Sequence, residues 1–324
     1  MKRRTIMSAL GGASLWSVSA YGQSNLEAPK VGFVYPGPKQ FAATRIEAIV
    51  GGLRASGNPL PQVEMVVRVA EGDAAKIEPM VAEVIDKKVS VFVAPGPAVL
   101  RAAKAATKTL PIIAYDFETD PIADKYAESI ARPGGNVTGI FLDFPNFAGK
   151  WIEILRECIS QLSRIAMLWE PSTGRVQVDA IAKTTGELNI QTALLEVKVR
   201  ADFAGAFAVA KDRGASAVII LSSPLVPPNV KELAELSLRY KLPAITLFSE
   251  FARTGGLFSY GPNLLGASKQ AGVLAGKVLL GASPASLPIE RPTNFELIVN
   301  QHTAEALGIA IPASIQVRAD EVIE

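Results

Sequence analysis

The sequence predicts an α/β protein built from two lobes, each a parallel β-sheet flanked by helices. Short apolar runs alternate with longer stretches whose apolar residues recur at helical spacing, which is the pattern of repeated βα units. The pattern restarts halfway: residues 109–115 resemble 241–247, and residues 89–97 resemble 215–224. The chain of 324 residues also exceeds the usual size of a single core. Two similar lobes are the simplest interpretation.

The first lobe is predicted from apolar runs that alternate with amphipathic segments. Its first helix places Ile46, Ile49, Val50 and Leu53 on one face and stops at Gly57. Apolar runs bounded by turn residues predict its strands. These strands are expected at residues 31–35, 90–94, 111–116 and 137–143.

The second half repeats this order and then crosses back. Strands are expected at 164–170, 217–223 and 243–249, a long helix at 264–280 should return to the first lobe, and a strand at 296–300 should complete the second. Three turn-rich segments, 142–146, 261–263 and 288–292, are interpreted as crossovers that form a hinge. The alternative is that they are ordinary loops within one large sheet. The expected limits are 28–142 plus 262–282 for lobe 1, and 143–261 plus 283–324 for lobe 2.

The N-terminal segment has the three parts of a secretory signal. Lys2, Arg3 and Arg4 precede a mostly apolar or small stretch at 6–20, and Ala20 and Gly22 occupy the small-residue positions before Gln23. Residues 1–22 are therefore predicted to be a signal peptide. The paired arginines permit the twin-arginine route as well as the general secretory route. Because no cysteine stands at the cleavage region to carry a lipid, we expect a soluble protein in the periplasm of a Gram-negative bacterium.

Composition argues against several classes of protein. The 33 Lys and Arg against 31 Asp and Glu give a net charge of +2 without a basic run, so no nucleic-acid partner is expected. One Cys and one His exclude an internal disulfide and make a multi-histidine metal site unexpected. Cys158 falls on the apolar stripe of a helix, which favours a buried thiol over a reactive one. The sequence lacks the G-x-S-x-G, G-x-G-x-x-G and P-loop motifs. We expect no metal, no cofactor and no catalytic residues.

The loops after the predicted strands are the candidate binding site. In open parallel sheets the loops at the carboxyl ends of the strands converge and form a crevice. These loops combine aromatic or proline residues with hydroxyls and carboxylates, which suits a partly apolar small molecule held by a few hydrogen bonds. The candidate ligand-binding residues are Tyr35, Gly37, Pro38, Gly96, Pro97, Tyr115, Asp116, Glu118, Trp169, Glu170, Ser222, Ser223, Ser249 and Glu250.

Two alternatives remain for this set. Tyr115, Trp169 and Phe248 could simply cap the two hydrophobic cores. The acidic residues Asp116, Glu118 and Asp120 could act as an acid and a base, although caps, turns and hydrogen bonds to a ligand explain them equally well.

Several motifs resemble a known family. The run from Ile130 to Gly139 (IARPGGNVTG), the preceding Asp120-Pro121, the segment 281–288 and the ending from Phe295 resemble ABC transporter substrate-binding proteins of the tryptophan/tyrosine type. The likeness covers nearly the whole mature chain. It implies two Rossmann-like lobes of a type I-like periplasmic binding protein, a three-crossover hinge, a ligand between the lobes, and an ABC permease and ATPase as partners.

The resemblance also bears on the ligand. Family members that bind aromatic amino acids use a Thr in a G-T-P loop and an Asp in the central loop of the second lobe. Here those places hold Gly96-Pro97 and Ser222-Ser223-Pro224, so an ammonium group would lose its carboxylate unless Asp116, Glu118 or Glu250 compensates.

The resulting expectation is a monomeric solute-binding component of an ABC importer that captures a small organic solute, with aromatic compounds among the candidates. The alternatives are a binding subunit for a sensor kinase or chemoreceptor, and an exported enzyme on a Rossmann-like scaffold.

Overall fold

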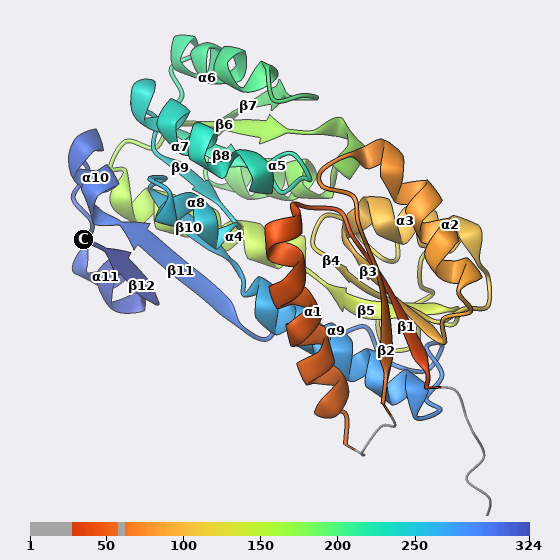
Figure 1. The fold of residues 1–324 in the computed structure, drawn as a ribbon. Coiled ribbons are helices and arrows are strands. Elements are labelled where there is room, and N and C mark those ends of the chain that lie inside the picture. Colours follow the sequence, from red (N-terminus) through yellow and green to blue (C-terminus); the bar gives the residue numbers. More distant parts are fainter. Residues whose placement is uncertain (1–27, 58–61) are drawn as a thin grey trace, which may run out of the picture.

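The computed structural model describes residues 28–57 and 62–324, and these form two lobes side by side (Figure 1). The predicted signal peptide lies outside the described residues. Lobe 1 contains a five-stranded sheet in the order β2-β1-β3-β4-β5, and every neighbouring pair is parallel. Its elements are β1 (Lys30–Tyr35), α1 (Lys39–Arg54), β2 (Glu64–Val69), α2 (Ile77–Asp86), β3 (Val91–Pro95), α3 (Gly96–Ala106), β4 (Ile112–Asp116), β5 (Val137–Phe141) and α9 (Leu264–Leu279).

The first sheet is covered by helices on both faces, as the apolar composition of its strands requires. Ile49 and Leu53 of α1 are buried with Val31 and Phe33 of β1, and the buried residues of α9 join the same cluster. On the other face, α2 and α3 pack against Val34 and the opposite residues of β3 and β4. This lobe therefore has three layers, with the predicted strands in the middle.

Lobe 2 contains a seven-stranded sheet in the order β12-β11-β10-β9-β8-β6-β7. One pair, β10 with β11, is antiparallel, which corrects the expectation of a fully parallel sheet. The chain reaches β11 directly from lobe 1 and enters the sheet from the opposite end. The elements are α4 (Phe144–Cys158), β6 (Arg164–Trp169), α5 (Val176–Glu187), β7 (Gln191–Glu196), α6 (Asp202–Asp212), β8 (Ala217–Ile220), α7 (Val230–Arg239), β9 (Ala244–Thr246), α8 (Ser249–Arg253), β10 (Phe258–Pro262), β11 (Phe295–Asn300), α10 (Gln301–Leu307), α11 (Ala313–Arg318) and β12 (Glu321–Ile323).

The chain crosses between the lobes three times, as the sequence predicted. The crossovers are β5 to α4, β10 to α9, and α9 to β11. Aromatic side chains from all three meet at the hinge. The ring of Phe147 lies 5.4 Å from that of Tyr260 and 5.8 Å from that of Phe295. The indole N–H of Trp151 donates to the carbonyl of Tyr260 at 2.7 Å, which ties the first crossover to the second.

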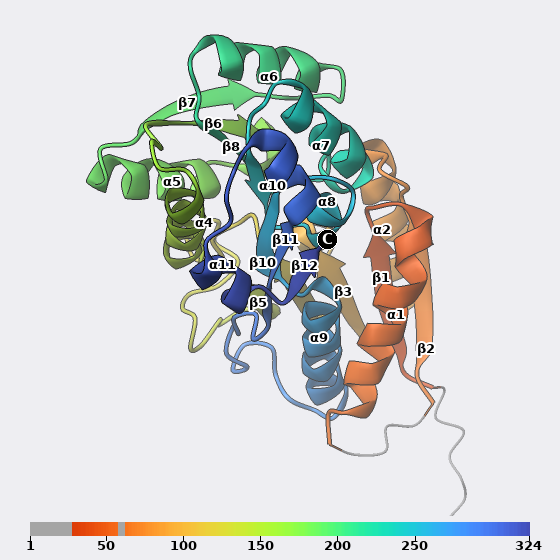
Figure 2. The ribbon, with the colours of Figure 1, turned by 90° about the vertical axis from the view of Figure 1, so that its left-hand side faces the viewer.

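The return of α9 to lobe 1 depends on glycine. Figure 2 shows α1 and α9 side by side in this lobe. A Cβ at Gly52 of α1 would overlap the carbonyl oxygen of Lys269 in α9, and a Cβ at Gly272 would overlap the carbonyl oxygen of Ile49. The two backbones can touch only because both positions lack a side chain, so a helix from the second half of the sequence becomes part of the first lobe.

The two lobes do not have separate cores, which differs from the expectation. One cluster of buried side chains runs from the α1 and α9 face of the first sheet through Phe144, Phe147 and Trp151 into lobe 2. The physical reason is the aromatic hinge, which fills the space between the lobes beside the crossovers. A second cluster is confined to the α2 and α3 face of lobe 1.

We propose the residue limits of the two lobes as predicted from the sequence, except for one segment between α9 and β11. Residues 283–290 are better assigned to lobe 1, because the Phe141 N–H donates to the Glu290 carbonyl and the Glu290 N–H donates to the Gly139 carbonyl. Gly134 also donates to the carbonyl of Ala285. We therefore propose that lobe 1 comprises 28–142 plus 262–290, and lobe 2 comprises 143–261 plus 291–324.

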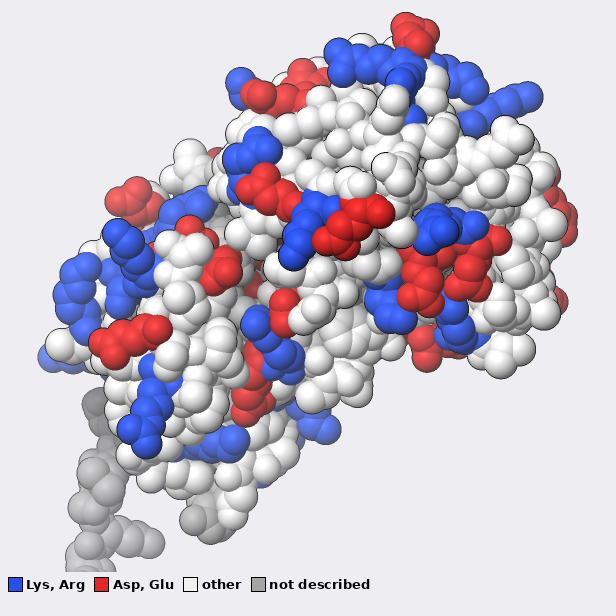
Figure 3. All heavy atoms as spheres, turned by 180° about the vertical axis from the view of Figure 1, so that it is seen from behind, with Lys and Arg blue, Asp and Glu red and all other residues white. Residues whose placement is uncertain are grey.

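The surface matches the near-neutral charge of the sequence. On the face seen in Figure 3, acidic and basic side chains are intermixed. Several are paired across elements, for example Arg318 with Glu157 at 2.7 Å. Within residues 28–57 and 62–324, none of the helices has the length and apolar character needed to span a membrane.

Candidate functional site

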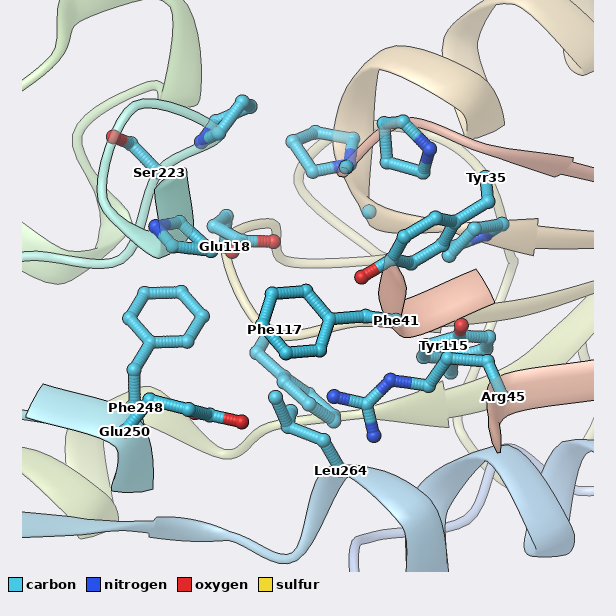
Figure 4. A pocket seen from close by; sticks show the side chains of 17 residues that line it. Tyr35, Phe41, Arg45, Tyr115, Phe117, Glu118, Ser223, Phe248, Glu250 and Leu264 are labelled. Atoms are coloured by element: carbon cyan, nitrogen blue, oxygen red, sulfur yellow. The ribbon is translucent and has the colours of Figure 1, made fainter. Parts of the chain in front are cut away.

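A pocket lies between the lobes at the carboxyl ends of the strands (Figure 4). It holds about 920 Å³ of space not filled by atoms, counted to its open mouth. Loops after β1, β3 and β4 supply one wall, loops after β8 and β9 supply the other, and the start of α9 closes the hinge side. The lining residues are Tyr35, Pro36, Gly37, Phe41, Arg45, Pro95, Gly96, Pro97, Tyr115, Phe117, Glu118, Ser223, Pro224, Pro227, Phe248, Glu250 and Leu264.

The walls are mainly aromatic rings and prolines. Phe117 of lobe 1 and Phe248 of lobe 2 are both buried, and Phe41 projects from the first turn of α1. Proline fixes its own φ, so the loops on both sides lose little backbone freedom when a ligand binds. The pocket is therefore a preformed apolar slot with few polar groups, the usual character of a small-molecule site.

Arg45 is the one cationic residue of the lining. It lies in α1, and only 7% of its surface is exposed. Within the described residues, no carboxylate oxygen comes within 4.0 Å of its guanidinium. A buried charge without a counter-ion is costly, so an arrangement of this kind favours an anionic group in the pocket.

Glu118 joins the two lobes directly. Its Oε1 accepts a hydrogen bond from the hydroxyl of Ser222, which belongs to the loop after β8. Both side chains are buried. The Ser222 loop is held in place by Gln177, whose side-chain amide exchanges two 2.8 Å hydrogen bonds with the Ser222 backbone. The bond from Ser222 to Glu118 therefore connects two rigidly held loops across the pocket.

Asp116 stabilises the loop that carries Glu118 through two hydrogen bonds. The Glu118 N–H donates to Asp116 Oδ1 at 2.9 Å, and the Thr119 hydroxyl donates to Asp116 Oδ2 at 2.8 Å. Burial raises the pKa of Asp116, against these hydrogen bonds. Burial, together with the neighbouring charge of Asp116, raises the pKa of Glu118 to about 8. Burial and Asp116 therefore both favour the protonated form of Glu118.

Two tyrosines flank Arg45. Burial raises the pKa of the Tyr35 hydroxyl, and the nearby guanidinium of Arg45 opposes this shift. Burial raises the pKa of Tyr115 to about 12, again with Arg45 in opposition. The Tyr115 hydroxyl is buried and has no hydrogen-bond partner within the described residues. Both tyrosine hydroxyls are therefore neutral beside the cation.

Eight of the candidate residues lie in the pocket lining and six do not. The lining contains Tyr35, Gly37, Gly96, Pro97, Tyr115, Glu118, Ser223 and Glu250, and it does not contain Pro38, Asp116, Trp169, Glu170, Ser222 and Ser249. Three of the six support the lining: Asp116 and Ser222 hold Glu118, and the Ser249 hydroxyl lies 3.3 Å from Glu250 Oε2. Pro38 is the N-cap residue of α1.

Trp169 and Glu170 lie away from the pocket because of the strand order. Their strand, β6, is separated from β9 by β8, so the β6 loop lies beyond the two loops that face lobe 1. The Trp169 N–H donates to the carbonyl of Gly174, and Ser172 donates to Glu170. The same loop contacts the rim of lobe 1, where Arg101 lies 3.4 Å from the carbonyl of Ser172.

Sequence reasoning missed Phe41, Arg45, Pro227 and Leu264, which come from helices and short turns rather than from strand ends. A sequence signal existed for one of them. Arg45 stands one residue before the apolar stripe that begins at Ile46 and four residues before Ile49, so it borders the buried face of the helix. Five further lining residues belong to the predicted loops but were not predicted to bind the ligand: Pro36, Pro95, Phe117, Pro224 and Phe248.

Within residues 28–57 and 62–324, no three His, Cys, Asp or Glu side chains are grouped closely enough to hold a metal ion.

Two lobes joined by three crossovers, with the strand ends of both facing a shared pocket, define a two-lobed ligand-binding protein with the type I periplasmic binding fold. The model of the family described as ABC transporter substrate binding protein matches residues 43–323. The chain belongs to this family, which is one of solute-binding proteins rather than enzymes.

Individual relatives are distant. A tyrosine-binding protein of Clostridioides difficile is 24% identical over 228 residues, which are 70% of this chain and 65% of that protein, less than two thirds of its length. The structure of an ABC domain from Streptococcus pneumonia in complex with L-Trp superposes with a TM-score of 0.83 at 22% identity, covering 91% of this chain and 99% of that one. A conserved domain protein from Vibrio cholerae gives 0.82 at 21% identity, covering 91% and 100%.

Proposed function

We propose that the protein is the periplasmic solute-binding component of an ABC importer and that it captures a small organic solute with an aromatic ring between its lobes. The observation that carries the proposal is the pocket itself. Aromatic and proline residues of both lobes surround it, and polar groups are few and directed inward. The ligands of two relatives also contain an aromatic ring, since one relative is named a tyrosine-binding protein and another is a complex with L-Trp.

The mechanism is capture by closure, without a chemical step. Ser223 and Phe248 on one side and Tyr35 and Phe117 on the other contact the solute together only when the lobes are closed. The solute therefore binds the closed form better than the open form, and this difference shifts the population toward closure. The predicted signal peptide, the hinge and the family support a monomer that delivers its solute unchanged to an ABC permease and ATPase.

A thermal-shift screen of residues 23–324 tests the proposal. The panel contains aromatic amino acids, their desamino acids and amines, nucleosides and sugars. A ligand at about a hundred times its dissociation constant adds roughly 2.7 kcal/mol, which raises Tm by several degrees. We expect aromatic compounds to give this shift and sugars to give none.

A pair of variants locates the site. Ser223→Leu places an isobutyl group in the pocket and should remove the shift. Ser90→Leu, an exposed change at the opposite end of β3, should keep it. The melting temperature of the ligand-free variants checks their folding. Absence of a shift with every compound, or recovery of a chemically altered compound, would contradict the proposed function.

A further inference from the structure

The polar groups of the pocket define two oppositely charged positions. Arg45 projects from α1 in lobe 1, and Glu250 projects from the first turn of α8 in lobe 2. Figure 4 shows the guanidinium and the carboxylate pointing toward one another across the pocket. Among the described residues, no ion pair within 4.0 Å joins these two side chains. Both side chains line the same pocket, so a ligand bound there can contact both.

In the described structure, Arg45 lacks the carboxylate partner that a buried arginine normally has. Its surface is 7% exposed, and the tyrosine hydroxyls beside it are neutral. A guanidinium that is withdrawn from water requires an anion with at least one well-placed oxygen. The open side of the guanidinium faces the pocket, so this anion has to come from the ligand.

Glu250 is the carboxylate that remains available to a cation. The other carboxyl of the lining, Glu118, already accepts the hydroxyl of Ser222 and lies against Asp116. Within the described residues, the only hydrogen bond to the Glu250 carboxylate comes from the neighbouring Ser249 hydroxyl, at 3.3 Å. The closest basic residue of its own helix, Arg253, is paired with Glu321 at 2.8 Å. Glu250 therefore has unused acceptor capacity aimed into the pocket.

We propose that the ligand is a zwitterion, with its carboxylate bound by Arg45 and its ammonium bound by Glu250. This inference rests on the proposed function and adds the residues that recognise the charged ends. The sequence of the loop after β8, Ser222-Ser223-Pro224, contains no acidic residue that could bind an ammonium group. In this proposal the acidic residue is Glu250, which lies in α8 after the neighbouring strand β9. Because one charge is on each lobe, a zwitterion bridges the lobes and stabilises the closed form.

The test compares matched probes by isothermal titration calorimetry. L-phenylalanine carries both charges, 3-phenylpropanoate lacks the ammonium, and phenethylamine lacks the carboxylate. L-tryptophan with indole-3-propanoate and tryptamine, and L-tyrosine with its two counterparts, form equivalent sets. For at least one set, the wild-type protein should bind the amino acid at least tenfold more tightly than either counterpart, since a charge-assisted hydrogen bond contributes about ten- to hundredfold.

Two variants separate the roles. Glu250→Gln should lower affinity for the amino acid by about ten- to hundredfold and leave affinity for the desamino acid unchanged or higher. Arg45→Met, which keeps most of the apolar stem, should lower affinity for the amino acid and for the desamino acid, but not for the amine. Arg54→Met on the same helix and Glu235→Gln in lobe 2, both at exposed positions, are the matched controls and should bind as the wild type does.

The outcomes are distinguishable. Tighter binding of a desamino acid by the wild type, or unchanged discrimination in Glu250→Gln, overturns the zwitterion and leaves a receptor for another aromatic solute. Unchanged binding in Arg45→Met also overturns it, because the guanidinium then contributes nothing to binding of the carboxylate. If the wild type binds no compound of any set and none in the thermal-shift screen, the proposed function fails with it.

Discussion

The hydrogen bond between Ser222 and Glu118 should control closure of the lobes, and Ser222→Ala removes it. The serine is 1% exposed and the glutamate 9%, so the deleted hydroxyl leaves a buried carboxyl group without its donor from the opposite lobe. An unsatisfied buried group of this kind costs about 1–3 kcal/mol, which is roughly 5- to 150-fold in the closing equilibrium. Under the proposed function the ligand binds the closed form, so the dissociation constant should rise by a similar factor.

The same contact predicts a dependence on pH with a definite sign. With the lobes in contact the pKa of Glu118 is about 8. Opening the lobes should expose this carboxyl to water and lower its pKa toward the ordinary value of about 4.3, although Asp116 in the same loop keeps it above that value. The closed form then binds one more proton between these values. The contribution of this proton to closure is fully present below the lower pKa. It decreases as pH rises and is lost once pH passes about 8. The limiting slope is about tenfold in the dissociation constant per pH unit.

Calorimetry with the ligand from the screen measures both effects. Titrations at pH 6, 7 and 8 in buffers of different ionisation enthalpy report the number of protons taken up on binding. Glu118→Gln imitates the protonated side chain and should flatten the pH dependence while keeping affinity near its value at pH 6. The reasoning is refuted if Ser222→Ala binds as tightly as the wild type, or if no proton is taken up and Glu118→Gln keeps the wild-type pH profile.

Three further predictions concern stability and reactivity. Gly52→Ala should lower the free energy of unfolding by about 1–3 kcal/mol or more, because its methyl group meets the backbone of Lys269; a denaturant titration with an unchanged midpoint would disprove the contact. Trp151→Phe should cost about 1–3 kcal/mol by leaving the Tyr260 carbonyl without its donor, measured in the same way. Burial raises the pKa of Cys158 to about 12, so a thiol reagent at pH 8 should react with it about a thousandfold more slowly in the native protein than after unfolding, and rapid native labelling would contradict this.

The sequence by itself determined the order of the elements and the location of the pocket. The periods of apolar residues placed the strands to within a few residues, as at 91–95 and 295–300, and turn residues located all three crossovers. The rule that ligands bind at the carboxyl ends of parallel strands then placed Tyr35, Glu118 and Ser223 in one region. These features are local, because they depend on side-chain alternation and turn chemistry that neighbouring residues set.

The tertiary structure decided which of those loops face the pocket and which charged residues line it. The position of β6 beyond β8 removes Trp169 from the pocket, and no local pattern encodes the order of strands in a sheet. Arg45 reaches the pocket only from a helix that packs on α9, a segment more than 200 residues away in the sequence. The bond from Ser222 to Glu118 and the opposition of Arg45 and Glu250 arise from the approach of two lobes, which depends on the hinge and on the whole fold.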